Sequence, residues 1–233
     1  MSLTAVEIMD EVMGLSGFFP SGSYAASVDQ DDKLIFSLLR RAARDIAKYR
    51  WTDLVRTGRI DITEATDTYP LPDDWREFIP NSIKTDNDLR PLNFPSDFGT
   101  WSRIDSKVGP TGIQHHLQIR QGSLEVLPSS SQAYTIRFDY ISNFPVLKAG
   151  TTDTLIKTFV SDGDLWLLDE DLIIKGLKLK WSIEKRLDTV SADLNDYKSY
   201  DWALKGTQAG AQKVALGGRG IYYPGSPYTN LWK

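Results

Sequence analysis

The chain has 233 residues, 41% of them hydrophobic and 25% charged, with a formal net charge of −4, which is typical of a soluble globular protein with one large or two small domains. No apolar run reaches the roughly 20 residues of a membrane helix, and the acidic N-terminus does not resemble a signal peptide, so we expect synthesis in a cytoplasm and no membrane contact. The lack of cysteine excludes disulfides, thiolate catalysis and cysteine-ligated metal.

Two helices are predicted in the N-terminal part of the chain. Thr4 and Glu7 have the spacing of a capping box, which predicts a short helix that ends at about Met13. A loop rich in Gly, Ser and Pro follows over residues 14–27. From Asp29 to about Tyr49, apolar residues recur at i, i+3 and i+4 spacing, which predicts an amphipathic helix.

The polar side of the second helix is strongly basic. It carries Arg40, Arg41, Arg44, Lys48 and Arg50. A basic face of this kind either contacts an acidic partner or DNA, or is only solvated. Both interpretations stay open, and we treat Arg40, Arg41 and Arg44 as candidates for a contact between subunits.

From residue 59 the hydrophobic pattern changes to short β-type runs, separated by Pro, Asn, Asp and Gly. The dipeptide Gln121-Gly122 predicts a tight hairpin, and a short helical or turn piece is expected near Ser96–Ile104. The pattern therefore predicts an antiparallel β domain. Its expected strands are Arg59–Thr63, Glu77–Thr85, Leu117–Arg120, Ser123–Leu127 and Ala133–Ser142.

Helices are predicted again over Leu165–Asp188 and from Val190 to about Lys205. At 100° per residue, the first of them has two apolar stripes, with the i,i+4 pair Lys180 and Glu184 between them. The stripes indicate either two packing partners, one of which is a second subunit, or a single broad buried face. One stripe holds Leu172, Leu179, Ile183 and Leu187, and the other holds Ile173, Ile174, Leu177 and Trp181. The subunit-interface candidates among them are Ile173, Leu177, Trp181, Leu179, Ile183 and Leu187.

The order of these elements predicts an α+β fold. Helices at both ends of the chain, residues 1–58 and 164–205, form one helical bundle. An antiparallel β domain, residues 59–163, is inserted between them. Residues 206–233 form an extended C-terminal arm.

The arm contains six glycines, two prolines and several large aromatic residues, but no acidic residue. Glycine and proline make a regular helix or strand costly, yet Tyr and Trp are typical of interfaces and rare in disordered tails. Residues 1–201 carry 31 acidic and 23 basic side chains, whereas residues 202–233 carry four basic ones. The sequence thus favours a basic arm that docks on another protein, although folding back on its own domain is the alternative. The candidate anchors are Arg219, Ile221, Tyr222, Tyr223, Tyr228, Leu231 and Trp232.

No motif for catalysis or for a cofactor is found. The common phosphate-binding and zinc-binding patterns are absent from the sequence. An acidic cluster over residues 162–171 does not have the spacing of an EF-hand, and helix capping explains carboxylates at such a position. We therefore expect no enzyme activity, no metal and no cofactor.

Four segments together resemble the head-to-tail adaptors of short-tailed bacteriophages, the tail tubular protein A or tail accessory group. They are RRAARDIAKYRW (40–51) with the turn TYPLPDDW (68–75), the helix LLDEDLIIKGLKLKWSIEKRL (167–187) and the helix ADLNDYKSYDWAL (192–204). The turn is the most specific of them, through Tyr69, Leu71, Pro72 and Asp74.

The resemblance implies a structural virion protein at the head–tail interface, assembled in the host cytoplasm. Such adaptors form a dodecameric ring below the portal protein, continue the channel through which the genomic DNA passes without sequence-specific binding, and dock tail nozzle and tail fibre proteins. Their C-terminal arm reaches into the portal. Two alternatives are a virion-associated peptidoglycan hydrolase and a module that binds carbohydrate or protein.

Overall fold

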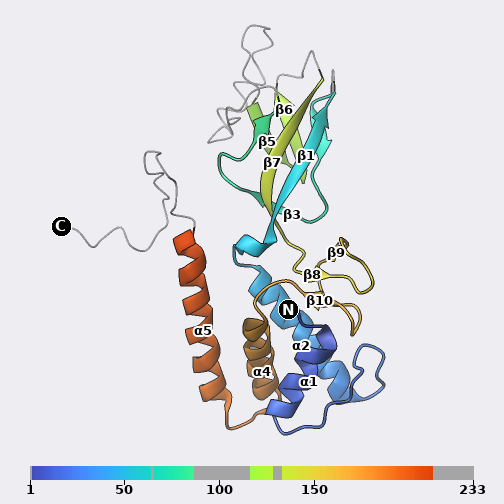
Figure 1. The fold of residues 1–233 in the computed structure, drawn as a ribbon, viewed down its shortest axis with the longest axis vertical. Coiled ribbons are helices and arrows are strands. Elements are labelled where there is room, and N and C mark those ends of the chain that lie inside the picture. The colour runs from blue at the N-terminus through green and yellow to red at the C-terminus, as the bar shows by residue number, and fades with distance from the viewer. Residues whose placement is uncertain (1, 64–65, 87–115, 128–132, 212–233) are drawn as a thin grey trace, which may run out of the picture.

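The computed structural model describes residues 2–63, 66–86, 116–127 and 133–211. Within these ranges the molecule is elongated (Figure 1), with the helices at one end and two β-sheets at the other. The helices come from the N-terminal and C-terminal parts of the chain, and the strands come from between them. The fold is therefore a mixed α+β fold, as the sequence predicted.

Four helices build the helical end, which we call the body. They are α1 (Ala5–Leu15), α2 (Gln30–Ala47), α4 (Glu170–Lys185) and α5 (Val190–Ala211). Helix α4 packs against the other three and lies between α5 and the N-terminal pair (Figure 1). The body core thus needs segments from both ends of the chain.

Side chains that cap the first turns explain where three of the helices begin. Thr4 and Glu7 form the predicted capping box, with the Thr4 amide 2.7 Å from a carboxylate oxygen of Glu7. Asp29 accepts hydrogen bonds from the amides of α2, and Asp169 accepts one from the Leu172 amide at 2.9 Å. These side chains satisfy amide groups that have no partner inside the helix. Helix α4 ends at Arg186, whose φ of 54° is left-handed.

Two sheets form the β end, which we call the β module. In the first, β7 (Tyr134–Ser142) lies between β1 (Val55–Ile62) and β3 (Trp75–Phe78), and β4 (Lys84–Thr85) also pairs with β7. In the second, β6 (Ser123–Leu127) lies between β2 (Thr68–Pro70) and β5 (His116–Arg120). All pairs are antiparallel. Buried side chains from both sheets form one core, which consists of Ile60, Ile62, Tyr69, Ile83, Leu117, Leu124, Val126, Ile136, Phe138 and Tyr140.

The predicted hairpin is confirmed. Gln121 and Gly122 join β5 to β6, and both have positive φ, 50° and 80°. Two positive φ angles in a two-residue loop are typical of a type I′ turn, whose twist matches that of the flanking strands.

A third, small sheet belongs to the body rather than to the β module. It consists of β10 (Leu165–Trp166), β8 (Val146–Leu147) and β9 (Leu155–Ile156), in that order. Val146 and Trp166 are fully buried among the helices. The segment predicted as one β domain, residues 59–163, therefore contributes to two separate cores.

Several predicted boundaries are wrong. The run Glu77–Thr85 is two strands, β3 and β4, because Asn81 takes a positive φ of 62° between them. Leu165 and Trp166 form β10 instead of starting a helix, and α4 begins at Glu170. Helix α5 continues to Ala211, past the expected end at Lys205. The piece expected near Ser96–Ile104 lies outside the described residues.

Gly58 on β1 is required by a close approach. A Cβ placed at this residue would lie 2.3 Å from the ring of Phe138 on β7, the strand to which β1 pairs. That ring is buried and packs edge-on against Phe78 at 5.0 Å between centroids. A side chain at residue 58 would therefore require the buried Phe138 ring to shift within its packed surroundings.

We predict that Gly58→Ala lowers the free energy of unfolding by about 1–3 kcal/mol, as overpacking of a filled core does. Gly14→Ala is the matched control, because a Cβ there meets no atom within 4 Å and alanine is the better helix former in α1. Urea denaturation followed by circular dichroism measures both variants. Equal stability of the two variants would contradict the packing argument.

Candidate interaction surfaces

Helix α5 is held along one narrow stripe. Its half-buried side chains, among them Tyr197, Tyr200 and Leu204, pack on the body core. Gly176 of α4 allows the close approach, because a Cβ there would lie 3.2 Å from the ring of Tyr197. Most of the other described side chains of α5, up to residue 207, are exposed. This helix is therefore a candidate for contacts with another protein.

A buried polar cluster fixes the first turn of α5 to α4. The Asp193 carboxylate is 7% exposed, accepts hydrogen bonds from the hydroxyls of Ser182 and Thr189, and lies 3.1 Å from Nζ of Lys178. Burial by itself raises the pKa of Asp193, but these hydrogen bonds outweigh it and hold the pKa below its usual value. The ionised carboxylate thus stabilises the junction of the two helices.

The predicted stripes of α4 meet neighbours inside the subunit. Ile173, Leu177, Trp181 and Leu179 are buried in the body, and Leu187 is half-buried. Of the six interface candidates, only Ile183 is a large exposed group, at 53%. Lys180 pairs with Asp45 of α2 at 2.8 Å, and not with Glu184 as predicted. A contact between α4 and a second subunit therefore stays a prediction, and Ile183 is the candidate whose side chain is exposed enough to make it.

The three candidate arginines of α2 have different surroundings. Arg40 donates from Nε to the carbonyl oxygen of Phe159 at 2.8 Å, and its guanidinium lies 4.4 Å from the ring centroid of Phe36. It connects α2 to the loop before β10. Arg41 and Arg44 are exposed, and Arg44 donates to the carbonyl oxygen of Arg40. Only these two are positioned for contact with a partner.

The family-like turn orders the β module. Tyr69 is buried, and its hydroxyl accepts from the Thr63 amide at 3.0 Å and lies within hydrogen-bond distance of the carbonyl oxygens of Thr63 and Thr66. The Trp75 amide donates to the carbonyl oxygen of Pro72 at 2.9 Å, which closes the turn, and Leu71 packs on the module core. These contacts give Tyr69, Leu71, Pro72 and Trp75 their places in the local fold.

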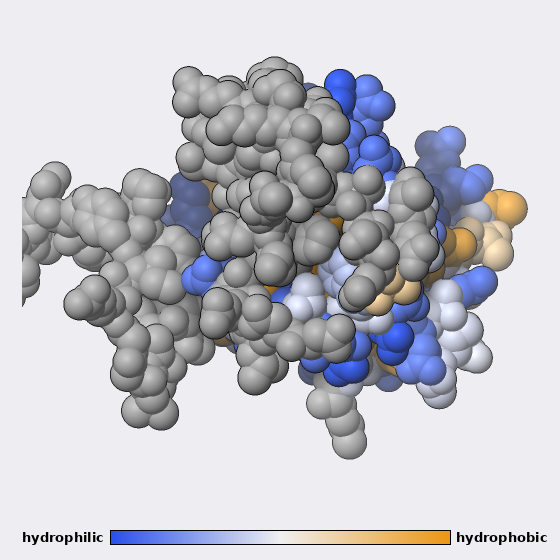
Figure 2. All heavy atoms as spheres, turned by 90° about the horizontal axis from the view of Figure 1, so that it is seen from above, coloured by the Kyte–Doolittle hydropathy of each residue, from blue (hydrophilic) through white to orange (hydrophobic). Residues whose placement is uncertain are grey.

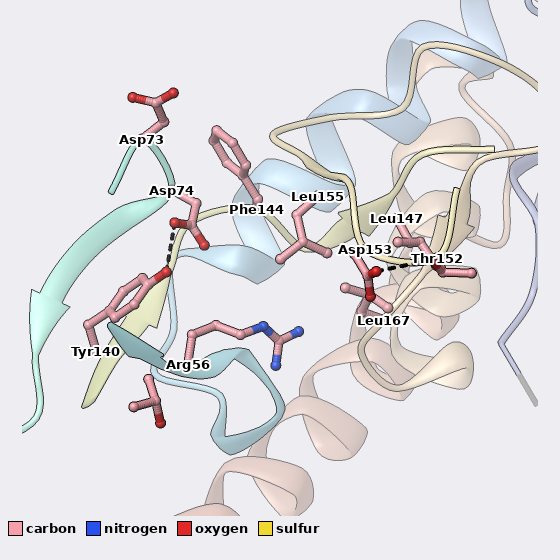
Figure 3. A pocket seen from close by; sticks show the side chains of 11 residues that line it. Arg56, Asp73, Asp74, Tyr140, Phe144, Leu147, Thr152, Asp153, Leu155 and Leu167 are labelled. Atoms are coloured by element: carbon pink, nitrogen blue, oxygen red, sulfur yellow. Dashed lines mark hydrogen bonds between the residues drawn. The ribbon is translucent and has the colours of Figure 1, made fainter. Parts of the chain in front are cut away.

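Asp74 connects this turn to the junction with the body. Its carboxylate accepts from the hydroxyl of Tyr140 at 2.8 Å (Figure 3), and its carbonyl oxygen accepts from the Asn143 amide. Burial, and then the hydrogen bond to Asp74, raise the pKa of Tyr140, so the phenol stays protonated. Asp74 therefore holds the chain where β7 leaves the β module.

A polar cleft of about 560 Å³ opens at the same junction. Figure 3 shows Tyr140 and Asp74 on the β-module side, Leu147, Leu155 and Leu167 on the body side, and Arg56 between them. The cleft separates the two cores, so its size depends on how the β module sits on the body. We interpret it as the joint between them and not as a substrate site.

The acidic cluster near residue 162 has a structural role. Asp162 accepts from the amides of Tyr24 and Ala25, and buried Asp164 accepts from those of Ala149 and Ser161. Burial raises the pKa of Asp164, but its hydrogen bonds outweigh this and lower the pKa overall. In the described part of the chain, no group of three His, Cys, Asp or Glu side chains is placed to bind a metal. Sequence spacing gave no signal for these long-range contacts.

Large exposed apolar residues lie on several elements of the described chain, among them Leu15, Ile119, Val160 and Ile183, and three are more exposed than these. On the loop between α1 and α2, Phe19 is 94% and Val28 is 88% exposed, and on α5, Trp202 is 74% exposed. Figure 2 shows apolar residues at one margin of an otherwise mainly hydrophilic described surface. Large apolar groups on a surface mark candidate protein contacts when they cluster. The predicted arm anchors, Arg219 to Trp232, lie outside the described residues.

Comparison with known families identifies the chain. The SU10 adaptor protein family matches residues 4–178, three quarters of the sequence. The protein belongs to the SU10 adaptor family. It is accordingly a bacteriophage structural adaptor, a component of the virion that contacts other virion proteins. No curated protein matches the chain.

The match covers α1, α2, the β module and the first half of α4. Helix α5 and residues 212–233 lie beyond it. None of the helices in the described ranges of this adaptor combines the length and apolar character of a membrane span. The family match thus covers the N-terminal helices, the β module and the start of α4, whereas the use of α5 must be argued from its own surface.

We predict that Asp193→Asn removes the acid sensitivity of the α4–α5 junction. A carboxylate with a lowered folded-state pKa stabilises the fold above its unfolded pKa of about 3.9, and this contribution is lost as the pH falls through the folded value. At neutral pH the variant should lose about 1–3 kcal/mol, because Lys178 loses its buried partner. Urea denaturation at neutral pH and near pH 3 measures both effects.

Asp196→Asn is the control for this prediction. Asp196 pairs with Lys175 at 2.6 Å, but its side chain is 57% exposed, so we expect a change below about 1 kcal/mol. If Asp193→Asn and Asp196→Asn behave alike at both pH values, the buried cluster does not hold α5.

We also predict that Tyr140→Phe loosens the joint. Removal of the hydroxyl that binds Asp74 should cost about 1 kcal/mol and speed amide exchange over residues 73–75 and 143. Thr57→Ala is the control in the same cleft, because its hydroxyl binds the side chain of Asp139 at the surface. Hydrogen exchange measured by mass spectrometry compares the two variants. Unchanged exchange in Tyr140→Phe would refute the proposed joint.

Proposed function

We propose that this adaptor forms a ring, a dodecamer, between the portal and the tail nozzle of a short-tailed phage. The ring continues the DNA channel, and tail fibre proteins dock on it. The family match carries this proposal, because it covers α1, α2, the β module and the first half of α4. The early steps of assembly take place in the host cytoplasm, before the protein becomes part of the virion.

The charge of the chain supports a channel role. Residues 1–201 carry eight more acidic than basic side chains. A wall of net negative charge repels DNA phosphates, so the genome passes without the counterion release that accompanies tight binding. The exposed Arg41 and Arg44 are assigned to a contact with a neighbouring protein rather than to the genome.

We assign the portal contact to the C-terminal arm. Helix α5 carries the chain to Ala211, and residues 212–233 add 22 residues with Tyr222, Tyr223, Tyr228 and Trp232. Fully extended at about 3.3 Å per residue, this length spans roughly 70 Å, enough to cross onto another protein. Because ordering a segment costs roughly 1–2 kcal/mol per residue, we expect the arm to order on contact with its partner.

Deletion of residues 226–233 should leave the melting temperature unchanged and abolish binding to purified portal rings, measured by native mass spectrometry and cryo-electron microscopy. A full-length variant with Tyr222, Tyr223, Tyr228 and Trp232 changed to Ser should fail in the same way, because aromatic anchors contribute most of the binding energy in such contacts. Lys213→Ala serves as the control with intact anchors. Undiminished portal binding by the deletion variant would refute the assignment of the arm.

A further inference from the structure

The two faces of the first sheet meet the body in different ways. In the register of this sheet, Glu77 lies opposite Ile141. One residue earlier on β7, Tyr140 lies opposite Arg56. Because successive residues of a strand point to opposite faces, these two pairs lie on different faces of the sheet. Ile141 is buried in the body core, whereas Tyr140 is buried in the core of the β module. The face with Glu77 and Ile141 is therefore the one that rests on the body.

This face is fixed to the end of α2 by two arginines. Arg76 of β3 donates from its guanidinium to the carbonyl oxygens of residues 47–49, at 2.7 Å to the first and 3.0 Å to the last. Carbonyls at a helix C-terminus have no partner inside the helix and carry the negative end of its dipole, so a guanidinium is a favourable partner for them. Arg50 donates to both carboxylate oxygens of Glu77, at 2.9 Å and 2.5 Å. These contacts form a fixed support for one side of the β module.

The other face is separated from the body by the polar cleft of about 560 Å³. The body side of the cleft presents Leu147, Leu155 and Leu167, all of them only half-buried (Figure 3). Removal of this apolar surface from water would stabilise a state in which the cleft is closed.

Two side chains of opposite charge lie on the two sides of this cleft (Figure 3). The Arg56 guanidinium donates to carbonyl oxygens of its own segment, those of Asp53 at 3.2 Å and Val55 at 3.1 Å. The Asp153 carboxylate, on the loop between β8 and β9, accepts from the hydroxyl of Thr152 at 3.0 Å. Neither charged group forms an ion pair with another described residue. A tilt of the β module toward the β8–β9 loop would bring the two charges together.

We propose that the β module tilts on the contact between Arg76 and the end of α2, and that this tilt closes the cleft and pairs Arg56 with Asp153. The supported face serves as the hinge, because its contacts lie next to the axis and change little. Burial of the leucine wall contributes to the stability of the closed state, and the ion pair selects its geometry. Each adaptor thus has two orientations of its β module on one body. This property belongs to the single subunit and does not depend on ring formation.

The absence of cysteine allows a direct test with two spin labels in one full-length molecule. Lys84→Cys on β4 and Lys157→Cys on the body, both at exposed positions, carry the labels. Double electron–electron resonance measures the distance between them, in a sample diluted with unlabelled protein so that only distances within one subunit contribute. We expect two distances, that of the open structure and a second, shorter one.

Reversal of either charge should deplete the closed state. Arg56→Glu and Asp153→Arg should each lower the population of the shorter distance by about fivefold, because attraction is replaced by repulsion, and the double reversal should restore it. Asp73→Arg is the matched control, because Asp73 lines the same cleft on the side of the β module and does not move relative to Arg56. Circular dichroism checks that each variant is folded, and Arg56→Gln replaces Arg56→Glu if the latter is not.

A single distance in the parent protein would overturn the inference, and so would a shorter distance that persists in both single variants. Failure of the double reversal to restore it would refute the pairing of Arg56 with Asp153. Arg76→Lys should broaden both distances, because an ammonium group cannot reproduce the planar fork that reaches several carbonyls. Unchanged widths in this variant would refute Arg76 as the hinge contact.

Discussion

Burial of α4 is the constraint on which the rest of the body depends. This helix begins after residue 169, yet its Leu172, Ile173 and Leu177 fill the centre between α1, α2 and α5. The N-terminal helices therefore have no complete core until the chain has passed through the β module and returned. Such a core makes the body depend on long-range contacts, whose formation must offset the loop-closure entropy of more than a hundred intervening residues.

The pair β1 and β7 connects the two cores. Their eight-residue register runs from Val55 opposite Ile141 to Ile62 opposite Tyr134. At one end of the pair, Ile141 belongs to the body core, and at the other, Ile136 and Phe138 belong to the core of the β module. The adaptor thus joins its β module to the body through β1 and β7, with β3 paired to β7 at the same end and the bond between Asp74 and Tyr140 beside it.

The sequence predicted what local chemistry decides. The cap at Thr4, the amphipathic pattern of α2 and the Gln121-Gly122 hairpin each depend on neighbouring residues, and each is found in the structure. The extension of α5 was missed because Gly206 lowers helix propensity. The place of β10 was missed because Leu165 and Trp166 also fit a helical pattern, whereas pairing with β8 is a tertiary contact.

The candidate surfaces were predictable only in part, since exposure is a property of the whole fold. The apolar stripes of α4 pointed to two neighbours, but periodicity does not distinguish a helix of the same subunit from that of another. Likewise the sequence does not distinguish Arg40 from Arg41, because the hydrogen bond from Arg40 to the Phe159 carbonyl oxygen is a long-range contact. Trp202 had no special signal, because a tryptophan at that spacing fits a buried stripe equally well.

The one-sided attachment of α5 has a mechanical consequence. Its buried polar anchor, Asp193, lies in the first turn, whereas the chain leaves from the last turn at Ala211. Tension applied to the chain beyond Ala211 would load the contacts with α4 one turn at a time, starting with Leu204 and Tyr200, in a peeling rather than a shearing geometry. Peeling begins at low force and meets its strongest resistance last, at the cluster around Asp193. A pull on the chain beyond Ala211 would thus be absorbed by α5 before it reached the core.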